Sequence, residues 1–189
     1  MKLLLASQSP RRKQLLQELC FKFQTVSIDC EEIIPENLSV EKASAYLSEL
    51  KANAYKNLEK DEVLLTADTV VISEGEILGK PKDKKEATEM LQKLSDTFHF
   101  VHTAFSLKNS EKIITKNDIA KVYLKKLNAA EIEMYIDQCK PYDKAGAYGI
   151  QEWIGMAKIE KIEGSFYTIM GLPTHLLYDA LQEFSINLE

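Results

Sequence analysis

The sequence predicts an α/β protein whose sheet contains both parallel and antiparallel strands. Early in the chain, strand-like apolar segments alternate with segments whose apolar residues recur at helical spacing. Turn residues at 74–75 and 109–110 predict hairpins in the middle of the chain. Residues 63–72 are almost continuously apolar or β-branched, which is typical of a central strand covered on both faces. Alternation favours parallel strands and hairpins favour antiparallel ones, so we expect a mixed sheet.

The chain opens with a short strand, a polar turn and a helix. Leu3–Leu5 form the strand, and Ser9 is a good N-cap for a helix that begins at Pro10. Two arginines, Arg11 and Arg12, fall in the first helical turn, where the helix dipole disfavours cations.

These residues predict an anion site. Unpaired N–H groups of the helix, the hydroxyls of Ser7 and Ser9 and the guanidinium groups of Arg11 and Arg12 converge on one place, which suits phosphate. A solvated basic face is the alternative, and both interpretations stay open at this point.

A second strand at 21–28 and an acidic loop at 29–32 come next, followed by a helix from Ser39 to about Asn57. Lys51 falls on the buried stripe of that helix or at its edge. A lysine there is either a snorkelling stem or a functional group, and it remains a candidate.

Asp68 interrupts the strand at 63–72. An unpaired carboxylate in such a strand would cost several kcal/mol, about the penalty for burying a charge. An aspartate satisfied in a turn or bulge is the alternative, but the flanking residues carry no turn signal. Asp68 is therefore a candidate functional residue.

The later elements follow from the same rules. A hairpin at 74–75 delivers Gly79-Lys80-Pro81, in which the glycine and the proline shape the backbone around one lysine. The remaining predicted elements are a helix capped by Asp83 and Glu86, strands at 98–107 and 113–124, a helix capped by Asn128 and Glu131, a glycine-containing loop at 141–151, a strand at 156–162 and a helix at 173–184.

Composition excludes several classes of protein. The 189 residues are 45% hydrophobic and 28% charged, and the net charge of -5 argues against broad nucleic-acid binding. The three cysteines form no C-x-x-C pair, so we expect reduced thiols and no zinc site. The apolar start stops at Ser7, too early for a signal peptide, and nothing approaches a membrane span. We therefore expect a cytoplasmic protein with no membrane partner.

Several motifs together resemble the Maf family of nucleoside triphosphate pyrophosphatases, the septum-formation-inhibitor-like proteins. The likeness runs from Leu3 to the last helix. The motifs that carry it are Ala6-Ser7-Gln8-Ser9-Pro10-Arg11-Arg12, Leu50-Lys51-Ala52, Ala67-Asp68-Thr69-Val70-Val71, Gly79-Lys80-Pro81-Lys82-Asp83, Asp143-Lys144-Ala145-Gly146-Ala147-Tyr148-Gly149-Ile150-Gln151 and Gly171-Leu172-Pro173.

The resemblance implies one domain over residues 1–189. Its fold would be an elongated mixed sheet flanked by helices, with a cleft between two lobes, similar to the fold of inosine triphosphate pyrophosphatases. The 143–151 motif is similar to the branch of the family that acts on dTTP and UTP. In that branch the residue matching Asp68 is the proton acceptor. The residues bearing on substrate choice match Arg11, Thr69 and Gln151. Other polar positions of the cleft match Ser7, Arg12, Glu32, Lys51 and Lys80.

The residues agree with that chemistry. Cleavage between the α- and β-phosphates of a nucleoside triphosphate needs cationic donors, a divalent ion and a carboxylate that prepares water. Arg11, Arg12, Lys51 and Lys80 supply positive charge, and Glu32 and Asp68 are oxygen ligands suited to Mg²⁺ or Mn²⁺. The products would be a nucleoside monophosphate and pyrophosphate. No Walker-type G-x-x-x-x-G-K-[ST] is present, which argues against P-loop chemistry.

Other functions stay open. A nucleotide-binding regulator of cell division would need the cationic phosphate ligands but no general base at Asp68. A 7-methyl-GTP pyrophosphatase is the alternative within the family, and the oligomeric state, for instance a homodimer, is not fixed. The sequence also departs from the family pattern, because Glu152 and Trp153 follow Gln151 where glycine is usual.

Overall fold

The computed structural model describes residues 1–186 and 188. It divides into two compact units. The first unit comprises Met1–Asp68, Thr103–Asp118 and Gly171–Glu189, and the second comprises Thr69–His102 and Ile119–Met170. Three long strands contribute residues to both units, namely β3 (Glu62–Ser73), β5 (Phe98–Lys108) and β6 (Ile113–Leu124).

Within the described residues, seven strands form one sheet in the order β2-β1-β3-β5-β6-β7, with β4 paired to β3. The four shorter strands are β1 (Lys2–Leu5), β2 (Phe23–Thr25), β4 (Glu76–Leu78) and β7 (Ile159–Glu163). β1 is parallel to β2 and β3, whereas the β3–β4 and β6–β7 pairs are antiparallel. The predicted mixed sheet flanked by helices is confirmed.

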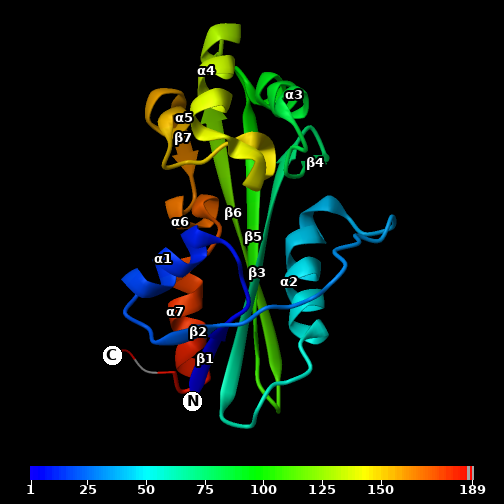
Figure 1. Cartoon of the computed structure of the whole chain (residues 1–189), viewed down its shortest axis with the longest axis vertical. Helices are drawn as coiled ribbons and strands as arrows, with labels where there is room; N and C mark the ends of the chain where they lie inside the picture. The colour runs from blue at the N-terminus through cyan, green and yellow to red at the C-terminus, as the bar shows by residue number, and fades with distance from the viewer. Residues whose placement is uncertain (187, 189) are drawn as a thin grey trace. The chain divides into compact units, whose positions relative to one another are not determined.

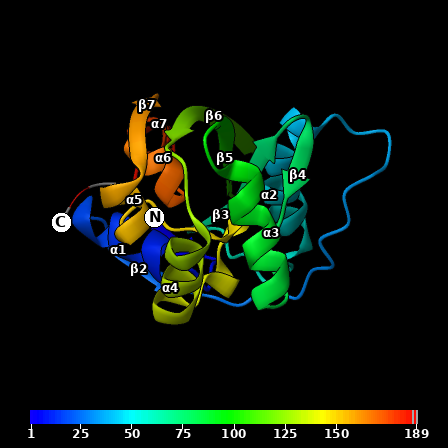
Figure 2. The ribbon, with the colours of Figure 1, turned by 90° about the horizontal axis from the view of Figure 1, so that it is seen from above.

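The α-helices of the first unit, among its described residues, are α1 (Pro10–Glu18), α2 (Ala43–Ala54) and α7 (Thr174–Glu183). Figure 1 shows α2 on one side of β1 and β3, with α1 and α7 on the other, and Figure 2 agrees for α1 and α2. Both sides bury aliphatic side chains, which explains why β1 and β3 read as continuous apolar runs. The buried set includes Leu3, Leu4, Leu5, Leu15, Leu16, Leu47, Leu64, Leu65, Leu177 and Leu181.

The second unit has its own core, and its α-helices are α3 (Lys84–Leu94), α4 (Ala129–Cys139), α5 (Trp153–Ala157) and α6 (Phe166–Met170). Helices α3 and α4 contact each other. The core contains residues from strands, helices and the 141–151 loop, among them Val71, Leu91, Val101, Val122, Ile132, Tyr135, Ile136, Ala147, Tyr148 and Ile154. The loop is therefore part of the packed interior of this unit.

Several predicted boundaries are wrong. The strand at 21–28 shrinks to Phe23–Thr25, and the helix at 39–57 consists of the 3-10 helix η1 (Val40–Lys42) followed by α2. The strand at 156–162 begins at Ile159, because α5 precedes it. Gly155 permits this helix, since a Cβ there would lie 1.6 Å from the Ile150 carbonyl oxygen. The loop at 141–151 contains two more 3-10 helices, η2 (Pro141–Asp143) and η3 (Ala145–Ala147).

Helix caps are only partly as predicted. Asn128 and Glu131 form a complete capping box at α4. The Asp83 carboxylate accepts from the Glu86 N–H, but the Glu86 carboxylate accepts from the Lys82 N–H and not from its own cap residue. Ser9 and Ser39 occupy N-cap positions without a side-chain cap bond.

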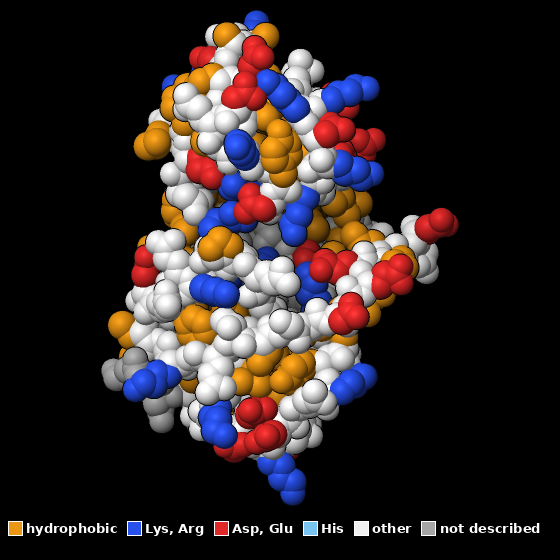
Figure 3. Space-filling view, in the orientation of Figure 1, with side chains coloured by type: hydrophobic (Ala, Val, Ile, Leu, Met, Phe, Trp, Pro, Cys, Tyr) orange, Lys and Arg blue, Asp and Glu red, His pale blue; other side chains and the backbone are white. Residues whose placement is uncertain are grey.

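The surface and the cysteines agree with the composition. Acidic and basic side chains are interspersed on the face that Figure 3 shows. Cys20, Cys30 and Cys139 are free thiols, as predicted. Among the described residues, no helix is both long and apolar enough to cross a membrane.

The caps provide a test of the fold. Asn128→Ala removes a cap that bonds the Glu131 N–H, so it should lower the free energy of unfolding by roughly 1 kcal/mol. Ser39→Ala is the matched control, because the Ser39 hydroxyl makes no cap bond, and its effect should stay within about 0.5 kcal/mol. Urea denaturation of both variants measures the difference. Equal losses for the two would contradict the assignment of the cap.

Candidate active site

Asp68 lies inside β3 and not in a turn. Its side chain is buried, with the residue 8% exposed. The parallel pairing of β1 with β3 ends at Leu5 and Leu65, and Asp68 lies three residues further along β3. The carboxyl ends of parallel strands are a common place for ligand sites in α/β folds. The interpretation of Asp68 as a turn aspartate is therefore wrong.

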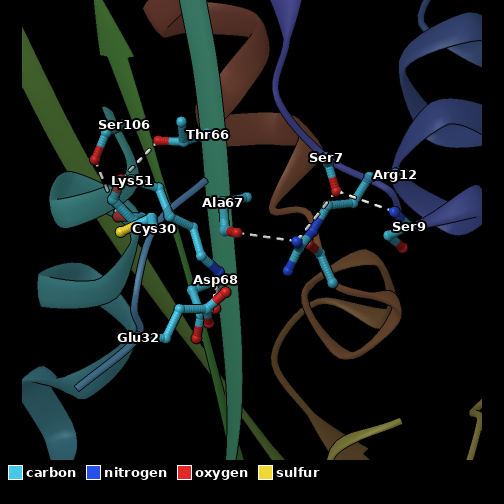
Figure 4. Close-up of polar contacts among 12 residues, drawn as sticks. Ser7, Ser9, Arg12, Cys30, Glu32, Lys51, Thr66, Ala67, Asp68 and Ser106 are labelled. Carbon is cyan, nitrogen blue, oxygen red and sulfur yellow. Dashed lines mark hydrogen bonds and ion pairs between the residues drawn. The ribbon is translucent and has the colours of Figure 1, made fainter. Parts of the chain in front are cut away.

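Lys51 joins Asp68 to Glu32. The Lys51 Nζ lies 2.7 Å from the Asp68 Oδ1 and 2.9 Å from the Glu32 Oε2. Figure 4 shows the lysine reaching from α2 toward both carboxylates. The Lys51 and Asp68 side chains are mostly buried, whereas the Glu32 side chain is half exposed. A lysine engaged by two carboxylates is not merely a snorkelling stem.

Burial dominates the electrostatics of Asp68. Desolvation raises the pKa of its carboxyl above the usual range, Glu32 adds to that rise, and Lys51 and Arg12 only partly oppose it. A carboxylate with a raised pKa takes up a proton more readily than an exposed one. The environment therefore suits a general base.

Arg12 ties the polar turn to the end of the sheet. Its Nε donates to the Gly171 carbonyl at 2.8 Å, and its Nη1 donates to the Ala67 carbonyl at 2.9 Å and to the Ser7 Oγ at 3.4 Å. The Ser7 Oγ also accepts from the Ser9 N–H at 3.2 Å. Arg12 approaches β3 from the side opposite Lys51 (Figure 4). For Arg12, the alternative of a solvated basic face is wrong.

This bonding explains the Gly171-Leu172-Pro173 motif, whose residue types alone indicate no role. Gly171 has a φ of +110°, in the region that favours glycine, and its carbonyl accepts the Arg12 Nε donor. Desolvation lowers the pKa of Arg12, with Asp68 and Glu32 acting in the opposite direction. Arg12 is thus both a structural tie and a positive charge close enough to act on Asp68. Arg11, the next residue back in α1, is half-buried.

A chain of hydroxyl groups holds α2 against the strands. The Thr66 Oγ1 donates to the Ser48 carbonyl at 2.7 Å, and the Ser48 Oγ lies 3.0 Å from the Ser106 Oγ (Figure 4). Thr66 precedes Asp68 by two residues on the same strand face, and Ser48 precedes Lys51 by one helical turn. The network therefore fixes Lys51 relative to Asp68. The sequence alone did not lead us to predict this hydroxyl network. Its signal was the spacing of the hydroxyl residues from Asp68 on the strand and from Lys51 on the helix.

Three predicted residues belong to the second unit. Lys80 and Gln151 are exposed, and Thr69 is half-buried. The Gly146 N–H donates to the Gly79 carbonyl at 3.0 Å, so the segment carrying Lys80 is tied to the loop carrying Gln151. Gly146 has a φ of +69°, and a Cβ there would lie 3.1 Å from Val71, so this close approach favours glycine.

The carboxylates fit a hard divalent cation. Asp68 and Glu32 both lie within 3 Å of the Lys51 Nζ, so their carboxylates are close together, and a divalent ion would share them with this ammonium group. The described residues contain no cluster of three histidine, cysteine, aspartate or glutamate side chains suited to a metal. Two carboxylates are nevertheless the usual protein share for Mg²⁺, whose other ligands are water and substrate phosphates.

Comparisons with known proteins agree with these motifs. The model of a family described as Maf-like protein matches residues 2–184. A dTTP/UTP pyrophosphatase of Porphyromonas gingivalis is 45% identical over 97% of this chain and 94% of its own. A dTTP/UTP pyrophosphatase of Flavobacterium johnsoniae is 43% identical over 95% and 93%, respectively.

One solved structure supports the fold. A HAM1 protein from Coxiella burnetii has a TM-score of 0.51 at 14% identity, over 97% of this chain and 99% of that one. At this identity the likeness is one of fold. The motifs and the match over residues 2–184 show that the chain belongs to the family of Maf-like proteins.

Proposed function

We propose that this protein is a pyrophosphatase that hydrolyses dTTP and UTP to the monophosphate and pyrophosphate. The observation that carries the proposal is the buried Asp68 held by Lys51, because a protein that only bound triphosphate would need no buried carboxylate with a raised pKa. The relatives at 41–45% identity that are named dTTP/UTP pyrophosphatases support the choice of substrate.

In this proposal, positive charge receives the phosphate chain. Arg11, in the first turn of α1, would contact phosphate oxygens. Lys80, exposed in the second unit, remains a candidate phosphate ligand. Ser7 contributes its hydroxyl at the turn that Arg12 holds in place. Arg12 adds charge while its bonds to Ala67 and Gly171 keep the turn at the end of the sheet.

Asp68 takes the proton of the attacking water. Lys51 orients the carboxylate through the contact at 2.7 Å, and Glu32 shares the same ammonium group. Asp68 and Glu32 would also hold Mg²⁺ or Mn²⁺ together with phosphate oxygens. Such an ion, when bound, neutralises developing charge on the phosphates and polarises the bond that breaks.

Gln151 and Thr69 select the base. The Gln151 amide offers a donor and an acceptor, which match the alternating carbonyl and N–H groups of uracil and thymine. Gln151 is exposed, whereas Ile150 before it is buried and Glu152 after it is half-buried, so the Gln151 amide is available to a ligand. Thr69 follows Asp68 directly on β3 and so links base selection to the reacting carboxylate.

The proposal treats residues 1–189 as one catalytic domain, working in the cytoplasm on a nucleotide without a nucleic-acid or membrane partner. The three free cysteines agree with a reducing compartment. A homodimer stays a prediction.

A substrate panel tests the proposed function. Chromatography measures the consumption of each nucleotide in the presence of Mg²⁺ or Mn²⁺. We expect kcat/KM for dTTP and UTP to exceed kcat/KM for CTP, GTP and 7-methyl-GTP. Preference for 7-methyl-GTP would favour the other branch of the family. Binding of triphosphates without consumption of any would favour a nucleotide-binding regulator.

Asp68→Asn should lower kcat by roughly 10²–10⁴-fold, the usual loss for a positioned base. The side chain keeps its size and can still contact Lys51, so the thermal unfolding temperature should not fall. Asp29→Asn is the matched control, because Asp29 is exposed and lies in the acidic loop three residues before Glu32. An Asp68→Asn enzyme with the turnover of wild type would remove Asp68 from the reaction.

Gln151→Ala should lower kcat/KM for UTP by roughly 10–100-fold, since two hydrogen bonds to the base contribute about 1–3 kcal/mol. The loss for CTP should be smaller, because its edge carries an amino group where uracil has a carbonyl. Equal losses on UTP, CTP and GTP would show that Gln151 does not select the base. Steady-state rates on the three nucleotides measure this difference.

A further inference from the structure

Gln151 sits inside a closed turn. The Glu152 N–H donates to the Gly149 carbonyl at 3.1 Å, so residues 149–152 form a four-residue turn with Gln151 in its third position. Gly149 and Ile150 are buried and Glu152 is half-buried, whereas Gln151 is exposed. The turn therefore has one side chain to present to a ligand, and that side chain is Gln151.

Tyr135 joins the two ends of this turn. Its hydroxyl accepts from the Gly149 N–H at 2.9 Å and donates to the Glu152 carboxylate. The tyrosine lies on α4 and is fully buried. Burial raises the pKa of Tyr135, so the hydroxyl keeps the proton that it donates. One rigid side chain thus sets the positions of the residues on either side of Ile150 and Gln151.

Lys144 engages the other oxygen of the same carboxylate. Its Nζ lies 3.1 Å from the Glu152 Oε1 and 2.7 Å from the Asp143 Oδ1, and its side chain is only 10% exposed. A Cβ at Gly149 would lie 2.8 Å from the Glu152 carboxyl group, so the carboxylate occupies the space beside this glycine. Both Glu152 oxygens are therefore held, one by Tyr135 and one by Lys144.

A separate contact already anchors the rest of the loop. The Tyr148 hydroxyl lies 2.7 Å from the His99 Nε2, and both residues are buried. Tyr148 and His99 hold the loop to β5 just before the turn begins. The contacts of Tyr135 constrain residues 149–152, and the contact of Glu152 with Lys144 ties this turn to the start of the loop.

We propose that Tyr135 and Glu152 are positioning residues that orient Gln151 and thereby set the preference for the base. The inference rests on the proposed function, in which Gln151 selects uracil and thymine. The inference gives the Glu152 carboxylate, which Tyr135 and Lys144 both engage, a role in base preference. A purely stabilising brace would change the stability of the protein but not its discrimination between bases.

The test compares kcat/KM for UTP with kcat/KM for CTP. Tyr135→Phe removes the hydroxyl and keeps the ring, and Glu152→Ala removes the carboxylate; each should lower the UTP-to-CTP ratio about tenfold, the effect of losing a well-made hydrogen bond. The kcat on saturating UTP should stay within about threefold of wild type, because the proposed function gives neither residue a contact with the phosphates. Glu152→Gln keeps an oxygen acceptor for Tyr135 and should retain most of the ratio.

A double-mutant cycle shows whether the effect passes through Gln151. In the Gln151→Ala background, Tyr135→Phe should change the ratio by less than about twofold, since the side chain that it positions is gone. Asn128→Ala, which weakens the N-cap of the same α4 helix without touching the turn, should lower the thermal unfolding temperature and leave the ratio unchanged.

The outcomes separate this inference from the proposed function. A wild type that prefers UTP, with Tyr135→Phe and Glu152→Ala lowering only the unfolding temperature, overturns the inference alone. An equal effect of Tyr135→Phe with and without Gln151 also overturns it. A wild type that hydrolyses neither UTP nor CTP overturns the proposed function and this inference together. If Tyr135→Phe does not fold, the same comparison is made with Glu152→Ala and Glu152→Gln.

Discussion

The structure of the first unit depends on the ammonium group of Lys51, which neutralises part of the charge of two carboxylates. Burying Asp68 without a cation would cost several kcal/mol, about the penalty for an unpaired buried charge. The contact at 2.7 Å offsets that penalty only in part, because the pKa of Asp68 remains raised. In the proposed function this incomplete compensation suits Asp68 to act as a base, since a fully neutralised carboxylate would hold a proton poorly.

Elements on both sides of β3 serve this interaction. On one side, the bond from Thr66 to the Ser48 carbonyl sets α2, and therefore Lys51, against the strand. On the other side, Arg12 binds the Ala67 carbonyl next to Asp68 and also reaches Gly171. Residues far apart in the sequence thus meet around one stretch of β3. Stability and function are coupled here, because the bonds that hold the unit together also position the charged groups.

Much of the fold could be predicted from the sequence, because the main helices and long strands follow strong apolar periodicity. The errors fall where local signals compete, as at α5, where Gly155 and close packing against Ile150 decide the structure. The sequence predicts Lys51 and Asp68 as two separate candidate residues but does not predict their contact. Spacing along the chain does not show which elements pack together. The bonds of Arg12 to Gly171 and of Tyr135 to Glu152 join distant positions and had no signal in a single sequence. The roles of all the candidate site residues in catalysis, substrate binding and metal binding remain predictions, including those of Asp68, Lys51 and Gln151.

The central claim is that the carboxylate held by Lys51 serves hydrolysis between the α- and β-phosphates. Phosphorus-31 NMR of UTP during turnover tests this most directly, because it identifies which anhydride bond breaks. The account predicts UMP and pyrophosphate in equal amounts from the first time point. Formation of UDP and inorganic phosphate would contradict it, since cleavage would then occur at the terminal phosphate.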